Sequence, residues 1–333
     1  MATSIKRSAI KPGVPAPGMA ARLGPTIDER RGVEYHELRA KSLVNRLNGR
    51  PMPFGWTVNP FRGCEMGCHY CYARYTHEFL GHNDPATFER RIYVKLSDRE
   101  SLRRQLVRAA RSGSLVALGT ATDPYQPAEG KFEVTRRLLE AARDVPGLRL
   151  SITTKSTLVA RDAALLAELA TRGELSVNFS IVTVDAALAR RLEPRAPRPD
   201  LRFDAMRALA GAGVETRLFI MPVLPLITDG EENLAALVRA GRAAGAAMAE
   251  SNVLFLRSGT RETFFAFLRA EFPGLVTEYE RLYARGAYAP ASYVAEIEAR
   301  VKRLGAAAGF PTRRRADRPI ENRRPPRQLS LVW

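Results

Sequence analysis

A strict alternation of strand-like and helix-like segments constrains the fold of this 333-residue chain more than any other feature. Short β-rich runs predict strands at residues 115–119, 148–154, 175–181, 216–223 and 253–256. Helical periodicity fills the gaps between them, at residues 132–143, 158–172, 200–212 and 232–248. Strands and helices in such alternation form a parallel sheet with right-handed crossovers.

One more strand is predicted at residues 54–60, directly before a cluster of cysteines. With it the pattern contains six βα units, fewer than the eight of a closed barrel. We therefore expect an α/β fold of the open or partial (β/α)6 barrel kind rather than a doubly wound sheet. In such folds the reactive residues gather at the C-terminal ends of the strands.

The composition divides the chain into four parts. Residues 1–50, rich in Pro, Gly and charge, predict an N-terminal arm with a short amphipathic piece at 35–47, and residues 51–258 predict the barrel. Residues 259–311 predict a C-terminal helical segment whose aromatic side chains are core rather than a platform for bases. Residues 312–333 predict a basic, flexible tail.

The chain shows no secretory or membrane signal. The N-terminus lacks the apolar stretch of a signal peptide, and no run approaches 18 apolar residues. We therefore expect a cytoplasmic protein with no membrane partner. Because the cytoplasm keeps thiols reduced, the three cysteines of this chain indicate metal binding rather than disulfides.

Those three cysteines lie within eight residues, in the pattern Cys64-x3-Cys68-x2-Cys71. Three thiolates on one loop can hold a metal centre but cannot complete its coordination. A zinc site would need a fourth ligand, and His69, between two of the cysteines, is poorly placed to provide it. The alternative is a [4Fe-4S] cluster whose fourth iron stays open to a small molecule.

An aromatic residue, Tyr70, directly precedes the last cysteine. The pattern C-x3-C-x-aromatic-C after the first strand of an α/β chain resembles the radical S-adenosylmethionine (SAM) superfamily. This resemblance implies a [4Fe-4S] cluster held by the three cysteines and a SAM molecule on the open iron. It also implies a reducing electron donor, such as flavodoxin or ferredoxin, that drives the cleavage of SAM to a 5′-deoxyadenosyl radical.

Several further motifs resemble the spore photoproduct lyase branch of this superfamily and the uncharacterised bacterial proteins grouped with it. The resemblance spans about residues 54–260. Besides the cysteine loop, it is carried by Thr122-Asp123-Pro124, Thr154-Lys155, Ser180, Glu193-Pro194 and Met221-Pro222.

The resemblance implies a SAM site at the strand ends. Thr122, in the turn that contains Asp123, and Lys155 correspond to ligands of the SAM carboxylate. Ser180 corresponds to a ribose contact, whereas Tyr70 and Met221 lie where adenine packs. Without the resemblance, the first turn is only an Asp cap before a helix and the lysine is only a solvated side chain.

Two positions are expected beside the substrate, and one of them sets this chain apart from the lyase. Thr120 occupies the place of the cysteine that returns a hydrogen atom to the repaired dimer, and a hydroxyl cannot replace a thiol in that step. Tyr72 corresponds to the tyrosine of the family's proposed relay and can still carry a hydrogen atom. The resemblance therefore implies the radical generator but makes dimer repair itself doubtful.

The chain is strongly basic, with 52 Lys and Arg against 35 Asp and Glu and a formal charge of +17. This excess favours a nucleic-acid partner, DNA above all, although an arginine-rich composition with solvated helix faces would give the same sum. Seven arginines between residues 312 and 327 favour phosphate binding by the tail.

The last six residues, Gln328 to Trp333, resemble the short peptide by which bacterial DNA polymerases and repair proteins dock on the sliding clamp. The alternative is a tail that folds back on the barrel.

The sequence thus predicts a radical SAM enzyme acting on nucleic acid, most specifically on a lesion or modified base in DNA. Two alternatives stay open: radical chemistry on RNA, a peptide or a metabolite, and a zinc-stabilised nucleic-acid-binding protein without catalysis.

Overall fold

A seven-stranded sheet forms the centre of the protein in the computed structural model, which describes residues 14–16, 18–47, 52–257 and 259–311. Six of its strands are parallel to their neighbours, and one antiparallel strand closes the edge. In sheet order they are β3 (Val44–Arg46), β4 (Trp56–Val58), β7 (Val116–Leu118), β8 (Arg149–Thr154), β9 (Glu174–Ser180), β10 (Glu215–Val223) and β11 (Ala249–Val253).

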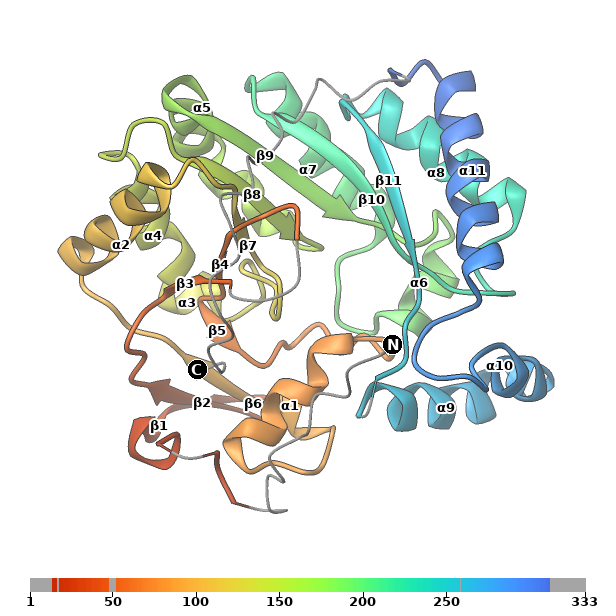
Figure 1. Cartoon of the computed structure of the whole chain (residues 1–333), viewed down its shortest axis with the longest axis horizontal. Helices are drawn as coiled ribbons and strands as arrows, with labels where there is room; N and C mark the ends of the chain where they lie inside the picture. Colours follow the sequence, from red (N-terminus) through yellow and green to blue (C-terminus); the bar gives the residue numbers. More distant parts are fainter. Residues whose placement is uncertain (1–13, 17, 48–51, 258, 312–333) are drawn as a thin grey trace, which may run out of the picture.

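From β4 to β11, each strand of this sheet lies beside the next one along the chain. Right-handed crossovers between such strands place the helices on one face, and the sheet curls with its helices outside (Figure 1). The two edge strands, β3 and β11, do not pair with each other. The expected partial barrel with six parallel strands is therefore confirmed.

Amphipathic helices cover the outside of the barrel. In α2 the Asp98 side chain caps the N-terminus by accepting a hydrogen bond from the Ser101 amide at 2.7 Å. Leu102, Leu106 and Ala109, spaced on one face of α2, are buried. The helices of this layer are α2 (Arg99–Arg111), α4 (Val134–Ala142), α5 (Ala163–Arg172), α7 (Pro199–Gly211) and α8 (Glu231–Ala243).

Two elements end or begin earlier than the sequence predicts. The helix expected at 232–248 ends at Ala243, because Gly245 adopts a left-handed conformation (φ +87°) and Ala246 donates back to the Gly241 carbonyl. The strand expected at 253–256 is β11, Ala249–Val253, which is largely polar because it pairs with β10 alone. The apolar run after it is mostly buried by packing rather than by strand pairing.

The N-terminal region is more ordered than the predicted arm. Instead of one amphipathic piece at 35–47, the chain forms strands, because Val33 and Tyr35, two residues apart, can bury one face in the main core. They belong to a second sheet in the order β1 (Leu23–Arg30), β2 (Val33–Leu38), β6 (Arg91–Val94) and β5 (Phe61–Arg62). This small sheet lies beside the cysteine loop, which begins where β5 ends.

The C-terminal helices complete the described chain. They are α9 (Thr260–Glu271), α10 (Val276–Leu282) and α11 (Ala291–Ala307), and α11 packs on β11 and α8. Phe264, Phe267, Tyr279 and Tyr283 are buried, as expected for core aromatics. The basic tail and its clamp-like peptide lie outside the described residues, and the boundaries predicted at 50, 258 and 311 stay predictions.

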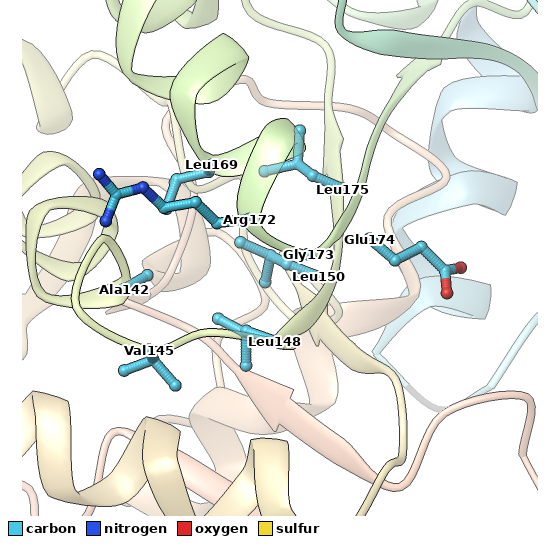
Figure 2. A pocket seen from close by; sticks show the side chains of 9 residues that line it. All are labelled: Ala142, Val145, Leu148, Leu150, Leu169, Arg172, Gly173, Glu174 and Leu175. Carbon is cyan, nitrogen blue, oxygen red and sulfur yellow. The ribbon is translucent and has the colours of Figure 1, made fainter.

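Within the described ranges, no helix is both long and apolar enough to cross a membrane. A small apolar hollow lies where β8 and β9 begin, lined by residues such as Leu148, Gly173 and Leu175 (Figure 2). Its volume of about 10 Å³ admits one water at most. It is at the opposite strand ends from the cysteine loop, so it is a packing defect rather than a ligand site.

Candidate active site

The cysteine loop occupies the gap between β5 and a 3-10 helix, η2 (Tyr72–Leu80). Cys64 and Cys68 are buried and Cys71 is partly buried, and all three are free thiols. Burial raises the pKa of each thiol, and the charge of Asp123 and the neighbouring thiols raise that of Cys64 further. A bound metal centre would offset this cost, since coordination holds cysteine as thiolate.

The loop offers three thiols, one fewer than the four ligands of a closed zinc site. Among the residues that the structure describes, no three His, Cys, Asp or Glu side chains are grouped to hold a single metal ion. A four-iron cluster takes each thiolate on a different iron, so its cysteines need not converge on one point. The ring of His69 stacks on Phe267 with 4.4 Å between centroids instead of turning to the thiols.

A buried arginine fixes the middle of the cysteine loop. The guanidinium of Arg74 donates to the Cys68 carbonyl at 3.0 Å and to the Glu89 carboxylate at 3.1 Å. Arg195 donates to the same carboxylate at 2.5 Å, and its amide donates to the Met66 carbonyl at 3.2 Å. Sequence reasoning missed this clamp, because nothing local pairs Arg74 with residues so distant in the chain.

The turn after β7 is tied to the start of the cysteine loop. The Thr122 hydroxyl donates to the Gly63 carbonyl at 2.6 Å and accepts from the side-chain amide nitrogen of Gln126 at 2.9 Å. The side-chain oxygen of Gln126 accepts from the Glu65 backbone at 3.0 Å. The structure therefore brings Thr122 beside the cysteine loop, as the family resemblance implied, with a fully buried Gln126 between them.

Asp123 holds the turn after β8 in place. Its carboxylate accepts from the Thr154 hydroxyl and the Lys155 amide, both at 2.7 Å, and from the Tyr125 amide at 2.9 Å. Burial raises the pKa of Asp123 although these hydrogen bonds act in the opposite direction. The oxygens of Asp123 are thus engaged by the turns after β7 and β8, and its role in binding SAM stays a prediction.

Four of the predicted SAM-binding residues meet in one network. Lys155 Nζ donates to Ser180 Oγ at 2.5 Å and lies 3.4 Å from a Glu193 carboxylate oxygen. The same ammonium lies 5.5 Å from the centre of the Tyr70 ring. Ser180 in turn donates to the Met221 carbonyl at 2.8 Å. The C-terminal ends of β8, β9 and β10 thus converge beside the cysteine loop.

A buried ion pair supports this network. The guanidinium of Arg202, which is fully buried, donates to the Glu193 carboxylate and to the Ser180 carbonyl, the latter at 3.0 Å. The Tyr70 hydroxyl also donates to Glu193. Burial alone would raise the pKa of Glu193, but Arg202 and Lys155 outweigh it and lower that pKa to about 2.

The sequence pointed to Glu193 only through its motif with Pro194, and Arg202 carried no signal at all. Arg202 lies in α7, among arginines that are mostly exposed, so its burial could not be read from local pattern.

Tyr72 and Thr120 lie together at the mouth of the barrel. The Tyr72 hydroxyl donates to the Thr120 carbonyl, and the Asn59 side chain donates to the Thr120 hydroxyl at 3.0 Å. The Tyr72 ring is tilted against Phe255, with 5.1 Å between centroids, and Tyr72 is 37% exposed. The two positions predicted to face the substrate are therefore neighbours, and their roles stay predictions.

A family model described as the radical SAM superfamily matches residues 58–238, which contain every element of this site. An uncharacterised protein of Mycobacterium tuberculosis is 39% identical over 274 residues, covering 82% of this chain and 80% of that protein. An uncharacterised protein of Methanocaldococcus jannaschii is 26% identical over 201 residues, covering 60% of this chain and 71% of that protein.

Among solved structures, spore photoproduct lyase complexed with dinucleoside spore photoproduct has a similar fold. The TM-score is 0.61 at 18% sequence identity, over 84% of this chain and 80% of that chain. A structure of the lyase with bound AdoMet and dinucleoside spore photoproduct gives a TM-score of 0.60, also at 18% identity, over 82% of this chain and 79% of that one.

Proposed function

Because the chain belongs to the radical SAM superfamily, we propose that it reductively cleaves SAM and applies the radical to a nucleic acid, with a DNA lesion or modified base as the favoured target. The observation that carries the proposal is the meeting of the cysteine loop with the strand ends that carry Thr122, Lys155 and Ser180. Enzymes of this superfamily use a [4Fe-4S] cluster and SAM, and when bound these supply a 5′-deoxyadenosyl radical.

Cys64, Cys68 and Cys71 would hold the cluster. The donor set fits it: three soft thiol ligands on one loop leave one iron without a protein ligand. Arg74 fixes the carbonyl of Cys68 in the middle of that loop. The chain's own contribution is therefore a rigid frame that orients the thiols.

The residues at the strand ends would bind SAM. Lys155, held by Ser180 and Glu193, offers a positioned cation to the SAM carboxylate, and Thr122 offers a hydroxyl beside it. Ser180 would contact the ribose, while Tyr70 and Met221 would border the adenine. Such positioning matters because bond cleavage requires the sulfonium to be held in one orientation.

Two observations support a nucleic-acid substrate. The formal charge of +17 favours a polyanion, and the fold resembles that of a lyase whose solved complex contains a dinucleoside photoproduct. Thr120, in place of a thiol, argues against the same repair reaction, so we propose a different lesion or base. Tyr72, at the mouth, would transfer the hydrogen atom.

The proposed partners follow from this assignment. A reducing protein such as flavodoxin or ferredoxin would supply the electron, and the peptide from Gln328 to Trp333 would dock on a sliding clamp.

Anaerobic reconstitution tests the proposal. The full chain should bind iron and sulfide and release 5′-deoxyadenosine from SAM only when a strong reductant is present. The Cys68→Ala variant, with the same preparation, is the matched control and should do neither. Stoichiometric zinc without iron, or no 5′-deoxyadenosine from a reconstituted cluster, would contradict the proposal.

A further inference from the structure

A second lysine, Lys95, lies at the mouth of the barrel outside the proposed SAM site. It directly follows β6, and its amide donates to the Pro60 carbonyl at 3.1 Å. The side chain is buried, with 8% of the residue exposed, whereas the next residue, Leu96, is 46% exposed. Lys95 thus lies just beneath the surface, at the end of a strand.

The ammonium of Lys95 has few hydrogen-bond partners among the described residues. Its one hydrogen bond to a described residue is to the Asn59 carbonyl, at 2.7 Å. No carboxylate of the described residues lies within 4.0 Å of it. Two of its three donors therefore have no protein acceptor in the described part of the chain.

A second cation lies on the same face of the small sheet. In the antiparallel pair of β5 and β6, Arg62 is opposite Tyr93, and Lys95 continues this register opposite Pro60. Directly opposed residues share a face, so Arg62 and Lys95 extend from the same side. Arg62 donates to the Thr76 carbonyl at 3.3 Å, and no ion pair joins it to a carboxylate of the described residues.

Two neighbouring cations without a counter-charge are costly to bury. Burial, and then repulsion by Arg62, lower the pKa of Lys95 to about 7. An apolar side chain of the same length would fill the space without this cost. An anion that binds between the two cations would offset this cost. It would also accept hydrogen bonds from the Lys95 donors that have no acceptor among the described residues.

The position of Lys95 connects it to the proposed reaction site. Asn59, whose carbonyl accepts from Lys95, donates through its side chain to Thr120 at 3.0 Å and accepts from the Ala121 amide at 2.7 Å. Thr120 in turn accepts from Tyr72. One residue, Asn59, therefore separates the lysine from the two positions expected to face the substrate.

We propose that Lys95 and Arg62 form a binding site for a phosphate group carried by the substrate. A phosphate provides the negative charge and several acceptor oxygens that both side chains lack. The inference deepens the proposed function, on which it rests for the location of the substrate. The phosphate belongs either to a nucleic-acid backbone or to a free nucleotide, and the experiment separates these sources.

Lys95→Met tests the site in the full reconstituted protein, with Lys302→Met as a control for the loss of one charge at an exposed position of α11. At constant ionic strength, inorganic phosphate should raise the thermal midpoint of the wild type and of Lys302→Met but not of Lys95→Met. Without phosphate, Lys95→Met should be at least as stable as the wild type. An equal phosphate response, or a Lys95→Met protein that fails to fold, would overturn the site.

Binding of a single-stranded oligonucleotide and of a nucleoside monophosphate then identifies the source. Lys95→Met should weaken the binding of the true ligand about tenfold, and for the oligonucleotide it should reduce the slope of log affinity against log salt by about 0.7. Lys95→Arg should retain most of the affinity. Unchanged binding of both ligands by Lys95→Met would overturn the proposal.

Release of 5′-deoxyadenosine without substrate should be the same in Lys302→Met and in the wild type. Its absence from the wild type would contradict the proposed function, yet would leave the phosphate test valid.

Discussion

The barrel mouth holds two lysines at the ends of strands, the partly buried Lys155 and the buried Lys95, and their surroundings differ sharply. Lys155, after β8, meets the hydroxyl of Ser180 and the carboxylate of Glu193. Among the residues that the structure describes, Lys95, after β6, meets a backbone carbonyl alone and faces another cation, Arg62. The same residue type is thus neutralised by the protein on one side and left without a counter-charge on the other.

The difference supports the ligands proposed for the two lysines. Where the protein supplies the counter-charge, the cation is held in one orientation, which suits a cofactor that must be positioned before reaction. Where it does not, the binding of an anion adds the missing charge, which suits a substrate that comes and goes. The net charge of +17 is therefore less informative than the place of these two cations.

Removing a cysteine should have the largest effect. It should act on the site that contains the cysteine loop and Lys155, and leave the site of Lys95 and Arg62 unchanged. We expect Cys64→Ala to abolish cluster binding and SAM cleavage, because two thiolates cannot hold the cluster. Iron analysis and 5′-deoxyadenosine measurement check this. Phosphate should still raise the thermal midpoint of the variant, and loss of that response would show that the two sides are not independent.

Removing the carboxylate that pairs with Lys155 should destabilise the protein. Glu193→Gln leaves Arg202 and Lys155 buried without their carboxylate, and we expect a loss of about 3 kcal/mol in the free energy of unfolding, measured with urea. Because the folded pKa of Glu193 is lowered to about 2, its contribution is present above the unfolded pKa near 4.3 and disappears as the pH falls towards 2.

Glu271→Gln is the matched control for Glu193→Gln. It removes a carboxylate whose ion pair with Arg191 is 43% exposed on each side, so we expect a loss below about 1 kcal/mol. Equal losses in the two variants would contradict the structural role of Glu193.

Removing the Lys95 cation should instead stabilise the protein. We expect Lys95→Met to gain about 2 kcal/mol in free energy of unfolding at pH 6. Since the pKa of Lys95 is about 7 when folded and about 10.4 when unfolded, wild-type stability rises with pH between these values. The advantage of the variant should therefore shrink from pH 7 to pH 10, and a constant advantage would contradict a buried charge.

The smallest effect on stability among the tested site residues is expected at Tyr72, beside Thr120. Tyr72→Phe loses one hydrogen bond to the Thr120 carbonyl, so we expect a loss of about 1 kcal/mol. SAM cleavage without substrate should continue, whereas product formation from the substrate should fall. Tyr75→Phe, in the same 3-10 helix, is the control, and an equal fall in product there would remove the special role of Tyr72.

The sequence predicts the parts of the fold that depend on local pattern. Five of the six parallel strands follow from apolar runs, whereas the largely polar β11 precedes the run that predicts it, and the cysteine loop follows from spacing. Helix α2 gives a weak signal because its apolar positions are spread among arginines. The strands β1 and β2 give a weaker signal, because β1 has no buried residue and β2 buries only half of its six residues.

The candidate site was predictable only where motifs mark it. Thr122, Lys155 and Ser180 follow strands and lie together as expected. Arg202 and Lys95 acquire their roles from burial and from partners distant in the chain, which no local pattern contains. Whether a lysine is compensated is a property of the folded molecule.

The transfer of deuterium from a labelled substrate into 5′-deoxyadenosine tests the central claim most directly, because it identifies the molecule that the radical attacks. We predict that deuterated DNA oligonucleotides carrying lesions or modified bases transfer label in the wild type, and that Lys95→Met needs a higher oligonucleotide concentration to do so. Label arriving from a peptide or a metabolite, with none from nucleic acid, would contradict this account.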